Sequence, residues 1–567
     1  MNAKACAVLG LETQWCVIDW DACHDQVKRM QARIVKATRE GRWGRVKALQ
    51  HLLTRSFSAK ALAVKRVTEN RGKTTPGVDG VTWSTPEEKS HAVSQLARHG
   101  YQPLPLRRVM IPKSNGKMRP LGIPTMKDRA MQALYLLALQ PIAEVKSDPY
   151  SFGFRPRRSS QDAAAQLRKV FYANPGKCAT WALEGDIKSC FDNIDHDWLL
   201  ANVPMDKLVL RKWLKSGFID SATFHATEAG TPQGGIISPT LANMALDGIE
   251  QLLHQRYWSA AKKQILRKVH LVRYADDFII TGDSKELLDD EIKPMIAEFL
   301  AARGMTLSQE KTKVTHVREG FDFLGWNFRM YPDPNRASGE VFLVKPSRKS
   351  MSSLVAKVRE ILRTSMSSTW EETLDRLNPV LRGWAMYHRY QNSKDVLARM
   401  DYVVWWMIWR WIKKRHAQKS GGWKFAKYTI WSEAHRRLGC IALDRYGRRT
   451  HKLLVQMAGI EVKKYTQIQR DANPFDPSWA EYFLLRSTKL MTATLYGQPL
   501  RLWRRQKGVC PNCLQLIDED SIWDSHHVLS REQGGENGDE NRVLVHTNCH
   551  RQMHSRKYDE IQIVSPV

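Results

Sequence analysis

The sequence lacks a hydrophobic run long enough to span a membrane. Its most apolar stretch, Val403 to Trp411, contains Arg410 and has about half of the roughly 20 residues that a spanning helix needs. We expect this stretch to form a buried helix, and we expect no membrane partner. The chain also opens without a charged segment followed by an apolar one, so nothing indicates secretion and a cytoplasmic location follows by default.

Cysteine is scarce as well, with nine residues in a chain of 567. Six of them are scattered without the spacing of metal ligands, and we expect these to be reduced thiols: Cys6, Cys16, Cys23, Cys178, Cys190 and Cys440. The other three, Cys510, Cys513 and Cys549, fall within forty residues of one another. They belong to a motif described below.

Acidic residues are outnumbered, with 58 Asp and Glu against 88 Lys and Arg, which gives a formal net charge of +30. The basic residues are spread along the chain rather than gathered in one tail. A polyanionic partner explains this charge most simply. An acidic membrane surface is the alternative, but it requires an amphipathic anchor or a long apolar run, and neither is evident in the sequence.

Internal repeats and low-complexity tracts are absent too, and the length exceeds what one hydrophobic core supports, so we expect several domains. Residues 20–70 have helical spacing, which a glycine-rich basic loop at 71–80 interrupts. Short apolar runs alternate with helical ones from about 104 to 344, which is typical of an α+β body. From about Ser350 the strands disappear and helices take over, one of them opened by a capping box of Thr369 and Glu372.

The helical region after 350 is aromatic as well as basic. We expect most of its tryptophans to lie in the core of a helix bundle, although rings beside Arg and Lys can also stack on unpaired bases. The six tryptophans are Trp370, Trp384, Trp405, Trp406, Trp409 and Trp411.

The sequence does contain an acidic apex between two apolar runs, HLVR-YADD-FIIT, with YADD at Tyr274 to Asp277. Two apolar runs joined by a tight turn predict a β-hairpin. Adjacent carboxylates at its tip repel each other, and a cation would offset that charge. Alone, the motif could also be a pair of exposed aspartates in a turn.

A second acidic position favours the catalytic interpretation. Asp186 ends another apolar strand, in the run Trp181 to Asp186, so three carboxylates can converge. Phosphoryl transfer from a nucleoside triphosphate needs two hard divalent ions about 3.5 to 4 Å apart, and oxygen ligands select Mg²⁺ over softer metals. We predict that Asp186 and Asp276 hold two Mg²⁺ ions and that Asp277 completes the site of a template-copying polymerase.

Six ordered blocks give the chain a family resemblance. Over nearly its whole length it resembles a bacterial group II intron-encoded reverse transcriptase and maturase. The blocks are IPKSNGKMRPLGIPTMKDR (Ile111 to Arg129), SFGFRP (Ser151 to Pro156), LEGDIKSCFDNIDH (Leu183 to His196), TPQGGIISPTLAN (Thr231 to Asn243), YADD, and FLGW (Phe323 to Trp326).

The resemblance implies roles for residues around the acids. Lys113 and Arg119 contact the incoming deoxynucleoside triphosphate, and their charges suit a phosphate. Phe191 takes the position that screens against a 2′-hydroxyl, for which the alternative is a strand-end core residue. Gln233 belongs to the loop that supports the templating base and the nucleotide, where neighbouring glycines allow close backbone approach.

The same resemblance implies contacts with primer and RNA. The FLGW block, with Phe323 and Gly325, matches the hairpin that grips the primer, although such a string alone most often reflects packing. Arg382, Trp384 and Tyr387 fall in the thumb or maturase region, which touches the primer–template duplex and the intron RNA. A solvated basic helix face with a tryptophan core is the alternative for this region.

The implied fold is multidomain α+β. It combines right-hand polymerase fingers and palm with an antiparallel sheet, an α-helical thumb or maturase domain, and a small ββα-metal module. We place an N-terminal helical extension at 1–100, fingers and palm at 101–345, the thumb or maturase domain at 346–455, a DNA-binding region at 456–503 and an HNH endonuclease domain at 504–567. The DNA-binding assignment rests on position only.

Two short motifs near the end of the chain have metal-ligand spacing. Cys510 and Cys513 form a CxxC pair, and His546 and Cys549 repeat this spacing with a histidine in place of one cysteine. Three cysteines and one histidine are a common tetrahedral set for structural Zn²⁺. The family often has a second CxxC here, so His546 as fourth ligand is a hypothesis.

Residues between and after these ligands resemble an HNH endonuclease. They are Asp524, His526, His527, Gly534, Gly535, Asn541, His550 and His554. The resemblance implies that His526, His550 and His554 surround a divalent ion such as Mg²⁺, that His527 activates water, and that Asn541 orients His527 or fixes the loop. On a helix, positions 550 and 554 share one face, and on a strand, 526 and 527 point opposite ways. A zinc-binding module without hydrolysis is the alternative.

Together these features predict a multifunctional retroelement protein. It would bind its own group II intron RNA as a ribonucleoprotein, assist splicing, nick target DNA, and copy an RNA template from a DNA primer. We expect it in the cytoplasm, and at the nucleoid when it is bound to its target DNA. Two alternatives are a non-enzymatic RNA-folding cofactor, whose usual mark would be loss of the acids, and a stand-alone reverse transcriptase without an intron, which leaves the maturase-like and nuclease-like segments without a task.

Overall fold

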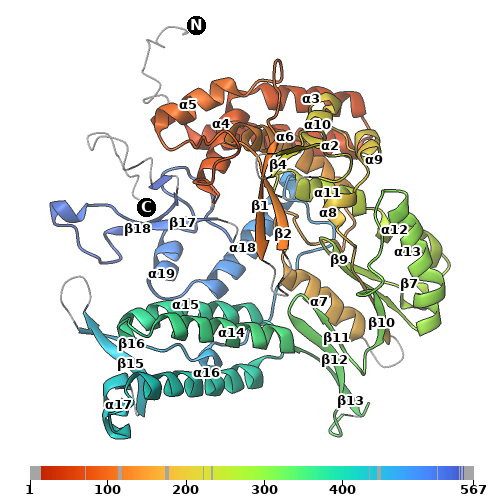
Figure 1. The fold of residues 1–567 in the computed structure, drawn as a ribbon. Coiled ribbons are helices and arrows are strands. Elements are labelled where there is room, and N and C mark those ends of the chain that lie inside the picture. Colours follow the sequence, from red (N-terminus) through yellow and green to blue (C-terminus); the bar gives the residue numbers. More distant parts are fainter. Residues whose placement is uncertain are drawn as a thin grey trace.

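The structure is a computed structural model of the chain (Figure 1). It describes residues 15–70, 72–112, 116, 118–172, 178–220, 223–231, 234–262, 264–336, 338–432, 435–443, 449–519, 521–547, 549–550 and 553. Three predicted site residues, Lys113, Gln233 and His554, lie outside the described residues.

The N-terminal part is a set of helices packed on α6 (Met126–Lys146). Residues 20–70 are helical, as predicted, and the glycine-rich basic segment falls in the connection between α4 and α5. Asp19 begins the first long helix by accepting a hydrogen bond from the backbone N–H of Ala22, which satisfies one of the open donors of that helix end. The helices are α2 (Trp20–Arg39), α3 (Trp43–Arg55), α4 (Phe57–Glu69) and α5 (Pro86–Gln95).

Two four-stranded sheets form the middle of the molecule. The first has the order β2-β1-β4-β5, with β1 (Leu106–Pro112), β2 (Met118–Ile123), β4 (Phe218–Asp220) and β5 (Thr223–His225). The second, called the palm sheet below, has the order β10-β3-β9-β8, with β3 (Trp181–Gly185), β8 (Leu271–Tyr274), β9 (Asp277–Gly282) and β10 (Lys313–His316). All its strands are antiparallel.

The palm sheet separates two hydrophobic cores, because successive side chains of a strand point to opposite faces. Leu183 of β3 and Ile280 of β9 pack in one core, whereas their neighbours Ala182 and Ile279 pack in the other. All four side chains are at most 2% exposed. A sheet buried on both faces cannot slip by one residue without exposing apolar groups, so the positions at its ends are fixed.

Helices and short elements complete this body around the palm sheet. They are α7 (Ser160–Phe171), α8 (Cys190–Asn193), α9 (His196–Asn202), α10 (Lys207–Leu214), α11 (Ser238–Leu246), α12 (Ile249–Tyr257), β6 (Trp258–Ser259), β7 (Gln264–Ile265), η1 (Leu266–Lys268), η2 (Leu287–Ile292) and α13 (Lys293–Ala301).

A three-stranded sheet joins this body to the thumb. It consists of β11 (Phe321–Phe323), β12 (Trp326–Pro332) and β13 (Glu340–Pro346). The thumb helices follow as α14 (Arg348–Thr364), α15 (Trp370–His388), α16 (Lys394–Arg415) and α17 (Gly421–Tyr428). The predicted capping box opens α15, where Thr369 and Glu372 bond to each other's backbone N–H groups.

The prediction that strands disappear after Ser350 is wrong. A three-stranded sheet of β14 (Thr429–Ser432), β15 (His435–Leu443) and β16 (Arg449–Leu453) follows the thumb helices. The indole N–H of Trp370 donates to the carbonyl of Gly439 at 3.1 Å, and Leu438 is buried in the thumb core. Charged residues such as Arg436 and Arg437 interrupt the apolar alternation, so the sequence gives no clear strand pattern there.

The prediction for the thumb tryptophans holds for five of the six. Trp370 and Trp411 are buried in the thumb core, and the partly buried Trp384, Trp405 and Trp409 pack against it, whereas Trp406 is exposed. The apolar stretch 403–411 lies in α16 and is buried on one side only: Ile408 is inaccessible, whereas Trp406 is 38% exposed. The stretch is therefore one face of an amphipathic helix.

The C-terminal part lies beside the N-terminal helices and the thumb (Figure 1). Its elements are η3 (Met457–Gly459), η4 (Pro477–Trp479), α18 (Ala480–Thr494), α19 (Gly497–Arg505), β17 (Trp523–His527), η5 (Arg531–Gln533) and β18 (Arg542–His546). Strands β17 and β18 form an antiparallel hairpin.

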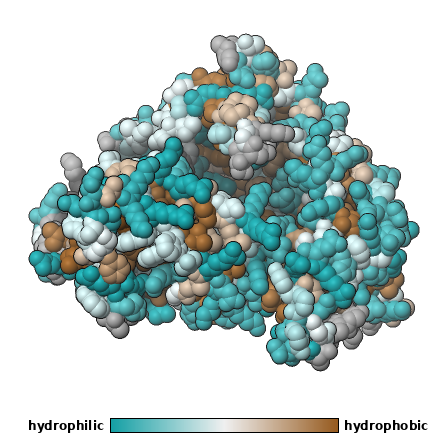
Figure 2. All heavy atoms as spheres, turned by 60° about the horizontal axis from the view of Figure 1, so that its bottom comes forward, coloured by the Kyte–Doolittle hydropathy of each residue, from teal (hydrophilic) through white to brown (hydrophobic). Residues whose placement is uncertain are grey.

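One face of the molecule is mainly polar. On the face shown in Figure 2, hydrophilic side chains predominate and the hydrophobic ones form small separate patches. Among the residues that the structure describes, no helix has both the length and the apolar character that crossing a bilayer demands.

A buried arginine holds the palm together. Arg273 of β8 is inaccessible to solvent and forms an ion pair with Asp247, whose side chain is 8% exposed. Arg273 also donates to the side-chain oxygen of Asn243 at 3.1 Å and to the carbonyl of Ala275 at 3.3 Å. Removing one partner of such a pair leaves an uncompensated buried charge.

We expect Arg273→Met to destabilise the protein by about 3–5 kcal/mol, because Asp247 loses its partner. A matched control is Arg318→Met, which removes a surface ion pair with Glu340 in which the two side chains are 67% and 33% exposed; such pairs contribute about 0–1 kcal/mol. Thermal unfolding of both variants measures the difference. Equal unfolding temperatures would show that the buried pair does not stabilise the palm.

Candidate active sites

The YADD motif forms the predicted hairpin. Strands β8 and β9 pair with Tyr274 opposite Asp277, so Ala275 and Asp276 form the tip. Ala275 has a φ of 59°, a left-handed conformation that a tight hairpin turn requires. Gly153 lies directly against this tip: a Cβ atom on Gly153 would be 2.3 Å from the backbone nitrogen of Ala275. The close approach therefore requires glycine at position 153.

The palm sheet brings Asp186 next to the YADD tip. In the pairing of β3 with β9, Gly185 lies opposite Phe278. Asp186 directly follows Gly185, and Asp277 directly precedes Phe278, so the sheet brings the two acids to the same end. Position 185 also requires glycine, because a Cβ atom there would lie 2.1 Å from the Phe278 ring.

The three carboxylates influence one another. Burial, together with repulsion from Asp276 and Asp186, raises the pKa of Asp277 to about 6. The ammonium of Lys311 donates to both carboxylate oxygens of Asp186, at 3.1 and 2.9 Å. A positive charge is thus already held at the acidic cluster, although the Lys311 side chain is 67% exposed.

These features fit divalent-ion binding. The donor set consists of carboxylate oxygens, which Mg²⁺ prefers, and like charges this close favour a cation between them. Asp186, Asp276 and Asp277 are the residues that would hold the ions. Lys311 offers a mobile charge on a flexible stem that can withdraw when an ion binds.

The predicted sugar-screening residue borders a cavity. Phe191 belongs to α8 and is half-buried, and it helps to line a cavity of about 410 Å³ together with Gly230 and Thr231. The ring of Phe154 lies edge-on to it, with centroids 6.2 Å apart. Phe191 lies on a helix rather than at a strand end, but it also packs against the main hydrophobic core, so its screening role stays a prediction. Arg119 is exposed on β2, and Lys113 and Gln233 lie outside the described residues.

The FLGW block forms a two-residue hairpin turn between β11 and β12. Leu324 and Gly325 form the turn with φ angles of 50° and 83°, and positive values at both positions are typical of a type I′ turn. Phe323 is 5% exposed and packs in a core. The Phe323 side chain is therefore a core residue, and the primer contact stays a prediction.

The three predicted thumb contacts all have partners within the protein. The Tyr387 hydroxyl donates to the carbonyl of Leu324 at 2.9 Å, and its ring stacks on Trp326 at 4.6 Å. The indole of Trp384 donates to Ser350 at 3.0 Å. Arg382 donates to the Tyr496 hydroxyl at 2.9 Å and lies over its ring. Tyr387 thus fastens the thumb to the FLGW turn, and the RNA contacts stay predictions.

The four predicted zinc ligands lie together. One ligand atom from each of Cys510, Cys513, His546 and Cys549 lies within 4.8 Å of the others. The three cysteines are at most 1% exposed. Four soft donors packed this closely, with no competing carboxylate among them, fit a tetrahedral Zn²⁺ site. His546 therefore stands where the hypothesis places the fourth ligand.

The histidines of the HNH motif divide between two neighbourhoods. On one side the rings of His526 and His550 are 5.1 Å apart, and Nδ1 of His550 lies 3.4 Å from Asp524. These three side chains could hold a divalent ion, with His554 outside the described residues. On the other side Nε2 of His527 lies 2.7 Å from the side-chain oxygen of Asn537. The predicted opposite orientation of residues 526 and 527 agrees with this division.

Asn541 fixes the loop, which was one of its two predicted roles. Its side chain donates to the carbonyls of Leu529 and Glu536 at 3.0 and 2.8 Å and accepts from the N–H of Leu529 at 2.7 Å. Asn537 and Arg542 both contact His527.

Sequence reasoning missed several residues of these sites. Lys311 and Asn537 reach the sites from other elements, and no motif marks their sequence positions. Asn243, which bonds to Arg273, ends the TPQGGIISPTLAN block but had no predicted role. Asp524 was named among the residues that resemble an HNH endonuclease, but no role was predicted for it. A signal did exist for Arg273, because a charged residue inside the apolar run before YADD must have a partner when it is buried.

Four family models match the chain. They are the reverse transcriptase (RNA-dependent DNA polymerase) model at residues 111–328, the N-terminal domain of reverse transcriptase at 15–96, the maturase-specific domain of group II introns at 351–431 and the HNH endonuclease at 510–556.

Curated proteins and solved structures give further similarities. Protein YkfC of Escherichia coli (strain K12) is 36% identical over 318 residues, which are 50% of this chain and 82% of YkfC. The group II intron-encoded protein LtrA of Lactococcus lactis subsp. cremoris is 32% identical over 332 residues, 47% of this chain and 54% of LtrA, so the match spans about half of LtrA. Telomerase from Candida albicans, solved with a fragment of telomeric RNA, has a TM-score of 0.34 at 14% identity, over 58% of this chain and 64% of that chain.

The order of the matched domains follows the order of the sites along the chain: the acids of the palm, then the thumb, then the zinc and histidine cluster. One relative is aligned over most of its own length, and another is an intron-encoded protein. The chain therefore belongs to the family of group II intron-encoded reverse transcriptases and maturases, and it combines an RNA-directed DNA polymerase with an HNH nuclease domain.

Proposed function

We propose that this protein binds its own intron RNA, assists its splicing, nicks a target DNA with the HNH module and copies the RNA from the exposed 3′ end. The observation that carries the polymerase part is that Asp186, which follows the last residue of β3, lies close enough to Asp277 at the start of β9 to add to the effect of burial in raising the pKa of that carboxyl. The formal charge of +30 supports polyanionic partners. We place the protein in the cytoplasm, and at the nucleoid when it is on target DNA.

In the copying reaction, Asp186, Asp276 and Asp277 would hold Mg²⁺, which when bound supplies positive charge to the transferred phosphoryl group. Phe191 would restrict the space next to the sugar, and Arg119 on the neighbouring sheet would attract the triphosphate. Lys311 would neutralise Asp186 between cycles, because its ammonium is already bonded to that carboxylate.

In the nicking reaction, His526, His550 and Asp524 would hold the divalent ion and His527 would take a proton from water. The contact between His527 and Asn537 supports this role because it orients the ring. Zn²⁺ bound by the Cys₃His cluster would fix the base of the hairpin, because His546 is the last residue of β18.

A purely structural RNA-folding cofactor is the competing function. It would need no acidic cluster, whereas all three acids are present and lie together. Loss of polymerase chemistry without loss of RNA binding is the result that separates the two functions.

We expect Asp276→Asn with Asp277→Asn to abolish primer extension on an RNA template. Losing the ion ligands removes several kcal/mol of transition-state stabilisation, or about a thousandfold or more in rate, while RNA binding stays close to wild type. Asp283→Asn is a matched control, since Asp283 follows the opposite end of β9. Continued synthesis by the double variant would refute the active site.

We expect His527→Ala to lower DNA nicking by about a hundredfold or more, the contribution of a general base, and to leave primer extension unchanged. Cleavage of an end-labelled duplex and extension of an annealed primer measure the two activities. His451→Ala, at an exposed position of β16, serves as control. Loss of both activities in His527→Ala would mean that the two reactions are not separable.

We expect Cys510→Ser or His546→Ala to reduce bound zinc from about one ion per chain to almost none, because each removes a ligand of the cluster. Metal analysis of the purified protein measures this. Cys440→Ser, which alters a thiol outside the cluster, should retain the metal. Unchanged zinc in His546→Ala would show that another group is the fourth ligand.

A further inference from the structure

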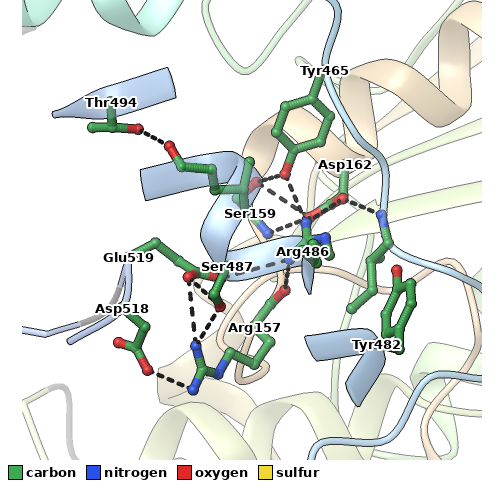
Figure 3. A network of polar contacts seen from close by, with 12 residues as sticks. Arg157, Ser159, Asp162, Tyr465, Tyr482, Arg486, Ser487, Thr494, Asp518 and Glu519 are labelled. Atoms are coloured by element: carbon green, nitrogen blue, oxygen red, sulfur yellow. Dashed lines mark hydrogen bonds and ion pairs between the residues drawn. The ribbon is translucent and has the colours of Figure 1, made fainter. Parts of the chain in front are cut away.

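A polar interface joins the HNH module to the polymerase body (Figure 3). Arg157 contributes to it from the polymerase body, Arg486 and Ser487 from α18, which packs on that body, and Asp518 and Glu519 from the module; these five residues are called the docking interface. Asp518 and Glu519 lie in the connection between the cysteine pair and β17. None of the five is among the residues to which the polymerase or nuclease chemistry is assigned above.

Arg157 makes the most direct contacts across the docking interface. Its guanidinium forms an ion pair with Asp518, reaches Glu519 at 3.5 Å and donates to the Ser487 hydroxyl at 3.1 Å. The Asp518 and Glu519 side chains are only 12% and 22% exposed. Salt screens partly buried pairs much less than exposed ones, so these contacts hold the module more firmly than a surface pair would.

The backbone of Arg157 gives a second indication. Its φ is 62°, in the left-handed region that is unfavourable for residues other than glycine. A glycine would adopt this conformation without strain. The side-chain contacts with the module offer a reason for an arginine at this position.

Arg486 anchors the body side of the docking interface. It is 3% exposed and binds both oxygens of Asp162 at 3.0 and 3.1 Å, while its other nitrogen donates to the carbonyl of Arg157 at 3.0 Å. Asp162 is completely buried and accepts from the N–H groups of Ser159 and Ile468. Arg157 is therefore mounted on a rigid part of the body.

A separate contact holds the module at another point. Gln515, two residues after the cysteine pair, receives a hydrogen bond from Lys28 and donates one to Asp21 at 2.6 Å, both on α2. Two anchors on different elements, α2 and the α7–α18 region, oppose rotation of the module about either one. The nuclease is thus fixed relative to the palm rather than tethered flexibly.

We propose that the docking interface sets the distance and orientation between the nuclease and the polymerase, so that DNA is nicked at one position and the new 3′ end is passed to the palm without release. This inference rests on the proposed function of both sites. A fixed arrangement raises the effective concentration of the nicked end at the polymerase above that of a flexible tether.

Three variants of the full-length protein, tested as the complex with its intron RNA, separate the docking contact from folding. Arg157→Gly removes the side chain but suits the left-handed backbone. Arg157→Asp places a like charge against Asp518 and Glu519, and aspartate tolerates this conformation better than most residues. Arg157→Asp combined with Asp518→Arg restores the pair in reverse. Glu340→Gln, which breaks the Arg318 surface pair, is the control.

Three measurements are made on each variant: the nick position on end-labelled target DNA, extension of a pre-annealed primer, and the fraction of nicks that are extended. We expect Arg157→Gly and Arg157→Asp to spread the nick over several positions and to lower the extended fraction on the order of tenfold. Pre-annealed extension should not change, and the reversed pair should recover most of the loss.

The outcomes distinguish this inference from the function on which it rests. A wild-type nick position and extended fraction in both single variants would overturn the role of the docking interface. Failure of the reversed pair to recover either quantity, with its zinc content and pre-annealed extension intact, would also count against it. Absence of any His527-dependent nick in the wild type would instead refute the proposed nuclease function.

Discussion

The repulsion among three carboxylates at one end of the palm sheet is the constraint on which the rest of the structure depends. Like charges separate unless packing holds them in place and a cation offsets them. The register of β3 and β9 places Gly185 opposite Phe278, and thereby brings the adjoining Asp186 and Asp277 close together; a sheet buried on both faces fixes that register. Gly153 packs against the backbone of the hairpin tip, and Arg273 donates a hydrogen bond to the carbonyl of Ala275 in that tip. Lys311 supplies a positive charge at Asp186 itself.

Buried arginines also stabilise this geometry, because their ion pairs join the elements that position the acidic site. Arg155 and Arg158 share Glu144, Arg486 holds Asp162, and Arg273 holds Asp247. A basic composition therefore does not translate entirely into nucleic-acid contacts. Some of the positive charge works inside the protein, where buried pairs impose one geometry because a mispaired charge would be strongly unfavourable.

Local patterns made much of the fold and site predictable. The YADD hairpin, the capping box of α15 and the Cys₃His cluster each follow from short-range chemistry with a strong spacing rule. What escaped prediction depends on distant partners. Whether Trp406 is buried or exposed is decided by the packing of α16, and Lys311 meets Asp186 only because β10 pairs with β3. The strands β14 to β16 alternate charged and apolar residues too irregularly for periodicity to reveal them.

The contact between α2 and Gln515 has a consequence for how the molecule comes to be assembled. Asp21 and Lys28 leave the ribosome nearly five hundred residues before their partner Gln515. Domains generally fold as units in the order of synthesis. The N-terminal helices must therefore fold while the surface of α2 that carries Asp21 and Lys28 is still exposed to water. The polar side chains of Asp21 and Lys28 can remain hydrated until Gln515 is made, whereas an exposed apolar face would promote aggregation during that time.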